Sequence, residues 1–157
     1  MVITIAGENI ARRKAREEFL RMDEFNRALT EVVRLHDFLG AWFRRELAED
    51  RFEPDFADAL HHDFENVQPA GVTLTRSDLL DPIRAGRGAN PDFQITIEAP
   101  RLLGTWPGLI LFQYTEHQTG ARASAPENRR LSTVLFEAGD KRLIWRYLTE
   151  IGLPEEA

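Results

Sequence analysis

Three apolar-rich runs in the last third of the chain predict long neighbouring strands: Leu109–His117, Leu131–Phe136 and Arg142–Glu150. A fourth run, Phe93–Glu98, alternates apolar and polar residues, the period-two pattern of a strand. The short polar segments between the later runs permit hairpins, and hairpin-linked strands pair antiparallel. The pattern therefore predicts an antiparallel sheet in the second half of the chain.

The first half of the chain follows a helical pattern instead. Between Glu8 and Asp50 there is one glycine and no proline. Apolar residues recur every three or four positions, at Phe25, Leu29, Val32, His36, Leu39, Phe43 and Leu47. This spacing predicts a long amphipathic helix over about residues 24–50, after Asp23 as its N-cap. The charged segment Ala11–Arg21 predicts a separate, more exposed helix or an extension of the long one.

The middle of the chain carries clear start and turn signals. Pro54 suits the first turn of a second, short helix, and His62–Gln68 predicts a short strand. Thr75, with Asp78 three residues later, forms a capping-box pattern ahead of a helix over Arg76–Ala85. Helices followed by a long curled sheet predict an α+β fold. In it the long first helix covers the apolar face of the sheet and leaves a pocket between them.

The length and the charge of the chain exclude some classes of protein. A chain of 157 residues fits one domain. Its net charge of −6 disfavours nucleic acid and anionic membrane surfaces as partners. It has no cysteine, which excludes disulfides, Cys-ligated zinc and thiol nucleophiles. No apolar run approaches the ~18–20 residues that span a bilayer, so we expect a cytoplasmic protein.

An ordered set of short segments carries a family resemblance. They are His36-Asp37-Phe38, Trp42-Phe43, Asp63-Phe64, Gln68-Pro69-Ala70-Gly71, Leu74–Leu80, Phe93–Glu98, Tyr114-Thr115-Glu116, Arg130–Thr133 and Trp145–Glu150. The set resembles the nuclear transport factor 2-like (NTF2-like) superfamily, and most of all the uncharacterised bacterial domain-of-unknown-function family 4440. The resemblance covers residues 24–153, which leaves an N-terminal helical extension at 1–23 and a tail at 154–157.

This resemblance implies a cystatin-like cone, in which a strongly bent antiparallel sheet cups the N-terminal helix around a cavity. It also implies a homodimer formed through the sheet. Superfamily members include ketosteroid isomerases, dehydratases, polyketide cyclases and the association domain of a calcium/calmodulin-dependent kinase, so fold alone assigns no function. One departure concerns the last strand, where the family often reads Trp-x-His-x-His-Glu. This chain reads Trp145, Arg146, Tyr147, Leu148, Thr149 and Glu150, so both imidazoles are missing.

Several residues are candidates for a site in the cavity. Approximate alignment with the kinase association domain places Tyr114, Thr133 and Glu150 toward the cavity, and Arg146 and Glu116 share that strand parity. His36 lies on the apolar stripe of the long helix. The predicted ligand pocket is His36, Tyr114, Thr133, Arg146 and Glu150.

Three of these groups are also candidates for catalysis. Glu150 could act as a base or as a hydrogen-bond acceptor, or it could simply pair with Arg146. Tyr114 could donate to a developing enolate oxygen, and Glu116 is a second candidate base. Arg130 could bind a ligand carboxylate or serve as a charge at the start of a strand.

A metal site and a cofactor are not expected. His61, His62 and Asp63 form a tempting group, but adjacent residues on a strand point to opposite faces and do not readily chelate one ion.

Three functions stay open. The first is binding of a small, mostly apolar molecule in the cavity. The second is an enzyme of the isomerase, dehydratase or cyclase type, with a pocket carboxylate and Tyr114. The third is a dimeric interaction module that takes no ligand, since the late strands are partly apolar on both faces.

Overall fold

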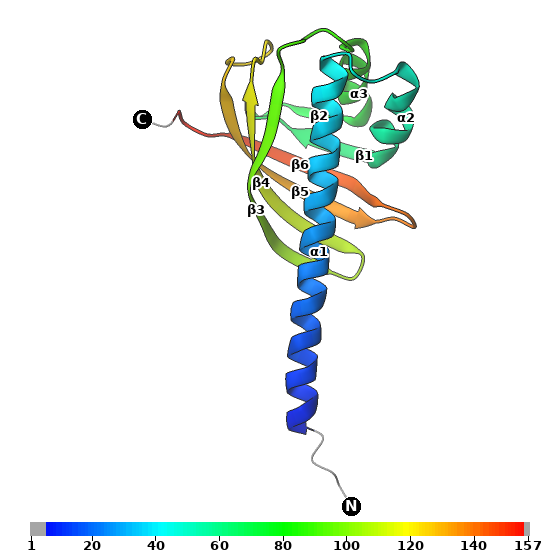
Figure 1. The fold of residues 1–157 in the computed structure, drawn as a ribbon, viewed down its shortest axis with the longest axis vertical. Helices are drawn as coiled ribbons and strands as arrows, with labels where there is room; N and C mark the ends of the chain where they lie inside the picture. Colours follow the sequence, from blue (N-terminus) through cyan, green and yellow to red (C-terminus); the bar gives the residue numbers. More distant parts are fainter. Residues whose placement is uncertain (1–5, 156–157) are drawn as a thin grey trace, which may run out of the picture.

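The chain folds as one long helix, short helical segments and a six-stranded curled sheet (Figure 1). The structure is a computed structural model and describes residues 6–155, so the ends of the predicted extension (1–5) and tail (156–157) lie outside the described residues. The elements are α1 (Ala6–Phe43), η1 (Glu49–Arg51), α2 (Phe52–Asp55), η2 (Ala57–Ala59), β1 (Leu60–Val67), β2 (Thr73–Thr75), α3 (Arg76–Ala85), β3 (Gln94–Trp106), β4 (Leu109–Thr119), β5 (Asn128–Ala138) and β6 (Leu143–Gly152).

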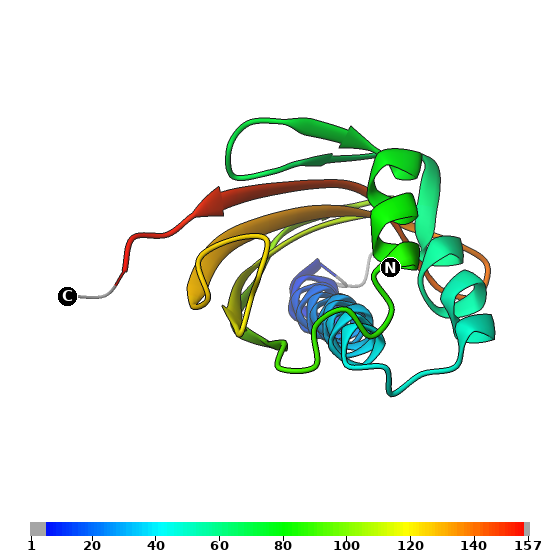
Figure 2. The same cartoon turned by 90° about the horizontal axis from the view of Figure 1, so that it is seen from above.

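The strands follow the order β2-β1-β6-β5-β4-β3 in one sheet. The hairpin neighbours from β3 to β6 pair antiparallel, as predicted. β1 pairs with β6 in parallel, so the sheet is mixed and the expectation of a wholly antiparallel sheet was wrong. No hairpin can join these two strands, because they run parallel and about half of the chain separates them. The predicted α+β class is confirmed, with a curled sheet wrapped around a helix (Figure 2).

α1 is one continuous helix of 38 residues, so the charged N-terminal segment extends the long helix and Asp23 lies inside it. The helix stops at Phe43, several residues before the predicted end. Arg45 has a φ of 63°, which turns the chain out of the helix. The N–H groups of Gly88 and Asn90 donate to the last carbonyls, those of Trp42 and Phe43. A distant loop therefore caps the helix, which local sequence cannot reveal.

β3 is one long strand, Gln94–Trp106, which continues past the predicted end at Glu98 and through Pro100 and Gly104. Register shifts follow Glu98 and Leu102, and Ala99 has a φ of 48°. At a bulge, an extra residue is left unpaired and the strand then continues, so these residues do not end it. Bulges also bend the sheet. By contrast, α3 has the predicted bounds, and both hydrogen bonds of the Thr75–Asp78 capping box form.

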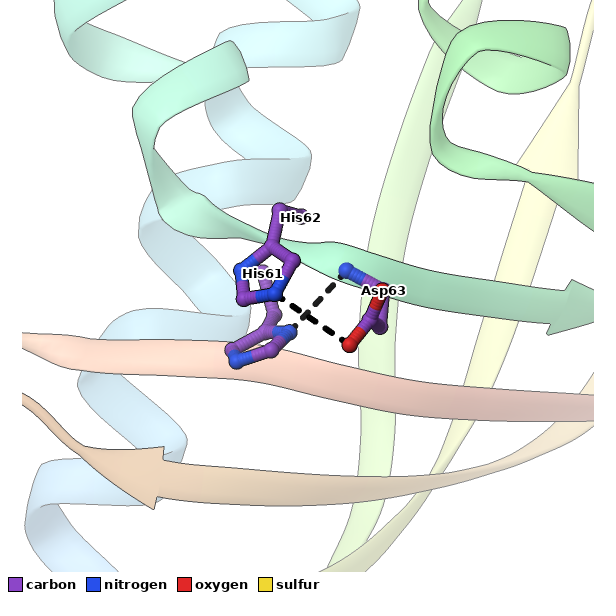
Figure 3. A group of neighbouring side chains, drawn as sticks. All are labelled: His61, His62 and Asp63. Carbon is purple, nitrogen blue, oxygen red and sulfur yellow. Dashed lines mark hydrogen bonds and ion pairs between the residues drawn. The ribbon is translucent and has the colours of Figure 1, made fainter.

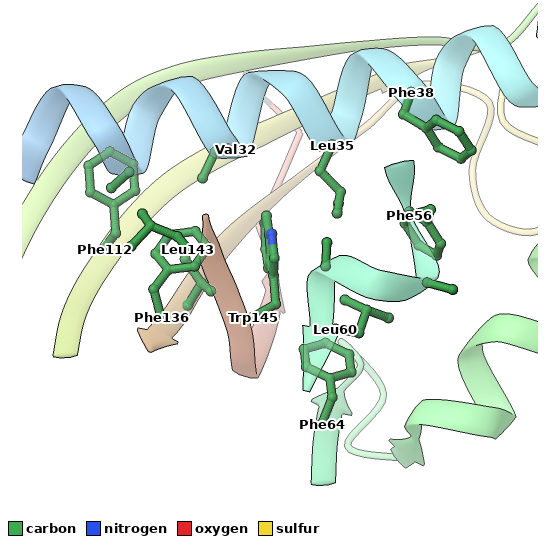
Figure 4. Close-up of a cluster of buried hydrophobic side chains, with 14 of the residues drawn as sticks. Val32, Leu35, Phe38, Phe56, Leu60, Phe64, Phe112, Phe136, Leu143 and Trp145 are labelled. Carbon is green, nitrogen blue, oxygen red and sulfur yellow. The ribbon is translucent and has the colours of Figure 1, made fainter. Parts of the chain in front are cut away.

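The core fills most of the space between α1 and the sheet. Val32, Leu35 and Phe38 on α1 meet the strand side chains Phe112, Phe136, Leu143 and Trp145, and Phe56, Leu60 and Phe64 complete one side (Figure 4). Each such side chain contributes ~1.5–3 kcal/mol on burial. These rings occupy much of the cone, so any ligand site must lie beside them. Within residues 6–155, no helix has the length and apolar character needed to cross a membrane.

Candidate functional site

The concave face of the sheet carries three successive rows of side chains. Phe112, Val134 and Leu148 pair across β4, β5 and β6 and form an apolar row. The next row is Tyr114, Ser132 and Glu150, and the one after it begins with Glu116 and Arg130. Alternate residues on a strand share a face, so the rows lie side by side on the concave surface. The structure therefore places Tyr114 and Glu150 on the same face, where the enzyme hypothesis requires them.

His36 on α1 completes one end of this polar cluster. Its Nε2 lies 3.2 Å from Glu116 Oε2, and its Nδ1 lies 2.7 Å from the carbonyl oxygen of Val32. A carbonyl only accepts, so Nδ1 carries a hydrogen, and one further proton is shared between Nε2 and the Glu116 carboxylate. The side-chain amide of Gln118 donates to the other Glu116 oxygen. His36 and Glu116 are both buried and form an ion pair.

Glu150 forms the other end of the cluster. Its carboxylate accepts from Asn66 Nδ2 at 2.8 Å and from Arg130 Nη1 at 2.9 Å. A second Arg130 nitrogen donates to Asn128, whose own amide donates to Gln118. The two ends are thus linked by one chain of hydrogen bonds, which starts on α1 and crosses β4, β5, β6 and β1. Two acids, one arginine and one protonated histidine balance the charge in the buried network.

The electrostatics of the cluster follow from burial and from these pairs. Burial alone would lower the pKa of His36, but attraction to Glu116 and the hydrogen bond with it raise that pKa above its ordinary value. Burial would likewise raise the pKa of Glu116, and His36 and Gln118 more than offset this, so that pKa is lowered. Burial and the two carboxylates raise the pKa of Tyr114 well above its usual range, so the phenol stays protonated.

Tyr114 and Ser132 lie between the two ends of the network without joining it. Tyr114 Oη, Ser132 Oγ and Arg130 Nε are buried and have no partner within good hydrogen-bond geometry, although Ser132 lies close enough to Tyr114 to oppose in part the rise of its pKa. Among the described residues, the one other buried side-chain atom in this condition is Asn90 Oδ1. Leaving a buried donor unpaired costs ~1–3 kcal/mol. Three such donors on adjacent positions of one surface mark the centre of the candidate site.

Two residues of the predicted pocket lie elsewhere. Thr133 pairs with Gln113 and Thr149 in register and accepts from the Gln113 amide, which puts it on the convex face. Arg146 donates to the backbone carbonyl of Asp63 and does not contact Glu150. A register shift on β6 pairs Leu135 with Tyr147 but Phe136 with Trp145, so Arg146 is the bulged residue. The bulge reverses the strand parity on which its placement was based, and the ion-pair partner of Glu150 is Arg130 instead.

Sequence reasoning missed most of the network. Asn66, Ser132 and Gln118 were not candidates, and Arg130 was only an alternative. Ser132 could have been found from the strand pairing, because it sits between Tyr114 and Glu150 in register. Asn66 reaches the site only through the parallel pairing of β1 with β6, for which the chain gives no local signal.

The convex face holds a second feature, a pocket of about 720 Å³ lined in part by His62, Asp63, Glu137 and Arg146. The ligand atoms of His61, His62 and Asp63 lie within 4.8 Å of one another (Figure 3). The two imidazoles stack, with ring centroids 4.1 Å apart, so the expectation that they face opposite ways was wrong. His61 Nδ1 already accepts the Asp63 N–H, however. That lone pair is not free for an ion, and the prediction of no metal site is kept.

Comparisons with solved structures identify the fold. An NTF2-like protein of unknown function from Pseudomonas aeruginosa is 28% identical, over 81% of this chain and 98% of that chain, with a TM-score of 0.73. An uncharacterised protein with a cystatin-like fold from Caulobacter vibrioides is 14% identical, over 84% and 91%, with a TM-score of 0.62. An NTF2-like protein from Streptomyces avermitilis, provisionally named a dehydratase, is 10% identical, over 85% and 98%, with a TM-score of 0.63.

The chain therefore has the NTF2-like, cystatin-like fold, and the predicted superfamily resemblance is confirmed. No protein-family model and no curated protein matches the chain, so the narrower likeness to family 4440 is not confirmed. The neighbours establish the fold and leave the function to the site itself.

Proposed function

We propose that the protein binds a small, mostly apolar molecule through a carbonyl or carboxylate oxygen, in the concave side of the sheet beside α1. One observation carries the proposal: the three unpaired donors Tyr114 Oη, Ser132 Oγ and Arg130 Nε, on adjacent positions of one buried surface. The three donors lie at adjacent register positions, and the apolar row of Phe112, Val134 and Leu148 lies next to them.

The three donors favour a ligand that carries an oxygen able to accept hydrogen bonds. If the two hydroxyls rotate to bond each other, one hydrogen is still left to donate, and Arg130 Nε can only donate. Because Glu150 already neutralises the Arg130 charge, the site accepts a neutral carbonyl as well as a carboxylate. A polar handle with an apolar wall is the usual composition of a small-molecule site.

Access to these donors determines what size of ligand can bind. Tyr114 and Ser132 are fully buried, whereas the Arg130 side chain is 16% exposed. A ligand would therefore enter beside Arg130, the most exposed of the three donors. This favours small molecules over extended ones.

A thermal-shift and calorimetry screen with aromatic carboxylates and cyclic ketones tests the proposal. Some of these probes should raise the melting temperature of the wild type, and Tyr114→Phe with Ser132→Ala should abolish that rise. Tyr147→Phe with Thr133→Val is the matched control, since it removes the same two hydroxyls from the convex face. Failure of every probe to bind, or equal binding by both double variants, would contradict the proposal.

The same geometry favours a second function, an enzyme that moves a proton next to a carbonyl. The His36 and Tyr114 rings are 5.3 Å apart, edge to face, so a proton-sharing pair adjoins a phenol donor. The Glu116 carboxylate, held in place by protonated His36, would take the proton from carbon, and Tyr114 would donate to the developing enolate oxygen. Both oxygens of Glu150 accept from Asn66 and Arg130, and both oxygens of Glu116 accept from His36 and Gln118, so either carboxylate gives up one of these bonds when it takes the proton. The dehydratase name of the Streptomyces avermitilis neighbour is consistent with this class.

Exchange of deuterium into enolisable ketones, followed by NMR, tests this second function. The wild type should accelerate exchange, and Glu116→Gln should slow it by about 10²–10⁴-fold, the usual contribution of a general base. Ligand binding without accelerated exchange would leave the binding function standing and exclude the enzyme.

A further inference from the structure

The N-terminal part of α1 projects beyond the sheet (Figure 1). Every residue from 10 to 23 is exposed, including large apolar side chains: Phe19 is 71% and Met22 66% exposed. A helical segment of this length without packing is marginal in water, because most helix stability in proteins comes from burying an apolar face. This segment therefore needs a partner to cover it.

One stripe of the projecting segment is apolar. Ala11, Ala15, Phe19 and Met22 follow one another at intervals of four, four and three residues, which places them on one side of the helix. Their sizes are ordered along the chain. The two small residues come first and the two large ones follow.

The charges of the segment are ordered in the same way. Its first half carries the four cations Arg12, Arg13, Lys14 and Arg16, and its second half carries the four anions Glu17, Glu18, Asp23 and Glu24 with one cation, Arg21. One intrahelical pair, Arg13 with Glu17, bridges the two halves. The segment is thus small and basic at one end, and large and acidic at the other.

We propose that this segment pairs antiparallel with the same segment of a second copy, about a two-fold axis near residue 17. In this arrangement Phe19 of one copy lies over Ala15 of the other, and Met22 lies over Ala11. Large side chains then meet small ones, and the basic half meets the acidic half. A parallel pair would set like charges and like sizes against each other, which is unfavourable.

A groove beside the helix extends the same surface. It has a volume of about 560 Å³ and is lined by Glu18, Arg21, Met22, Phe25, Asn26 and Leu102 of β3. In the antiparallel pair, positions 18–22 of this groove face residues 12–16 of the second copy. The small, basic half of the partner helix would therefore lie along a groove that is largely apolar and carries both Glu18 and Arg21.

Analytical ultracentrifugation of the full chain without lipid or ligand tests the pairing. The wild type should be a dimer at micromolar concentration, and Phe19→Glu with Met22→Glu should raise its dissociation constant at least tenfold. Leu20→Glu is the matched control, since Leu20 is 47% exposed but lies about 100° around the helix from Phe19. A monomeric wild type would overturn the proposal. So would a dimer that resists the double variant, which would place the contact on the sheet face instead.

The orientation has its own test, because the chain has no native cysteine. A mixture of Ala11→Cys and Met22→Cys chains should form mixed disulfides on mild oxidation, and Ala11→Cys alone should not. Rapid cross-linking of Ala11→Cys to itself would indicate a parallel pair and contradict the proposal. None of these variants alters the polar cluster, so ligand binding serves as an independent check that they fold.

Discussion

His36 Nε2 lies 3.2 Å from Glu116 Oε2, and this contact joins α1 to β4 across 80 residues of sequence. The Val32 carbonyl fixes a hydrogen on the other ring nitrogen, so the contact is attractive only while the pair holds its shared proton. Both groups are buried, which keeps solvent from weakening the attraction. The pair therefore couples the stability of the fold to pH.

The first prediction concerns this coupling. The pKa of His36 is raised above 6.5, so its contribution is complete below pH 6.5 and is lost as pH rises through the raised value. The pKa of Glu116 is lowered below 4.5, so its contribution is complete above pH 4.5 and is lost as pH falls through the lowered value. The pair should thus stabilise the protein most between pH 4.5 and 6.5.

Urea unfolding of the wild type and Glu116→Gln across pH 5 to 9 measures this effect. At low pH the variant should lose about 3–5 kcal/mol, as is usual when one partner of a buried pair is removed. The difference should shrink at high pH, where neutral His36 can accept from the new amide. A difference that stays constant with pH would show that the shared proton does not stabilise the fold.

The second prediction separates stability from binding at Tyr114. Its buried hydroxyl makes no hydrogen bond, so Tyr114→Phe removes an unpaired polar group without leaving a cavity. The free energy of unfolding should stay the same or rise by about 1 kcal/mol, even though ligand binding is lost. Tyr147→Phe, at a 36% exposed position, should change neither quantity. A clear loss of stability in Tyr114→Phe would mean that the hydroxyl is bonded in the free protein.

Features set by neighbouring residues could be predicted from the sequence, and features set by distant contacts could not. Thr75 and Asp78 fix the start of α3 through bonds within one turn, and the bounds of that helix were correct. The end of α1 depends on the N–H groups of Gly88 and Asn90, and its predicted end was too late.

In the candidate site, too, local sequence predicts some placements, and contacts between distant strands determine the others. Tyr114 and Glu150 share a face because each lies on a regular stretch of strand, which parity describes correctly. The prediction put Arg146 on the wrong face. A bulge on β6 changes which residues of the strand face the cavity on its N-terminal side, and no residue in the run from Trp145 to Leu148 indicates a bulge. Asn66 enters the site through a parallel pairing between distant strands, for which periodicity gives no evidence.

The third prediction contrasts two glycines. Gly71 and Gly120 both have positive φ, at 86° and 67°. A Cβ on Gly71 would meet nothing within 4 Å, whereas a Cβ on Gly120 would overlap the backbone of Asp92. Gly71→Ala should cost only the backbone strain, about 1–2 kcal/mol. Gly120→Ala should add about 1–3 kcal/mol for the overlap, and urea unfolding at neutral pH measures both. Equal losses would show that the loop beside Asp92 yields freely.

The last prediction concerns Arg130 and Glu150, whose side chains are 16% and 7% exposed. Arg130→Met leaves the more buried Glu150 carboxylate with only the Asn66 amide, so it should cost about 3–5 kcal/mol. Glu150→Gln should cost less, about 1–3 kcal/mol, because water can reach the remaining Arg130.

The double variant should be less destabilised than the sum of the two, with a coupling of about 0.5–3 kcal/mol in urea unfolding. Arg130 is also the outermost donor of the proposed ligand site, so Arg130→Met should abolish carboxylate binding. Glu150→Gln should preserve carboxylate binding, because the charge of Arg130 is then less neutralised. Additive losses of stability would show that the ion pair is screened by solvent. Loss of carboxylate binding in Glu150→Gln alone would place the ligand on the glutamate instead of the arginine.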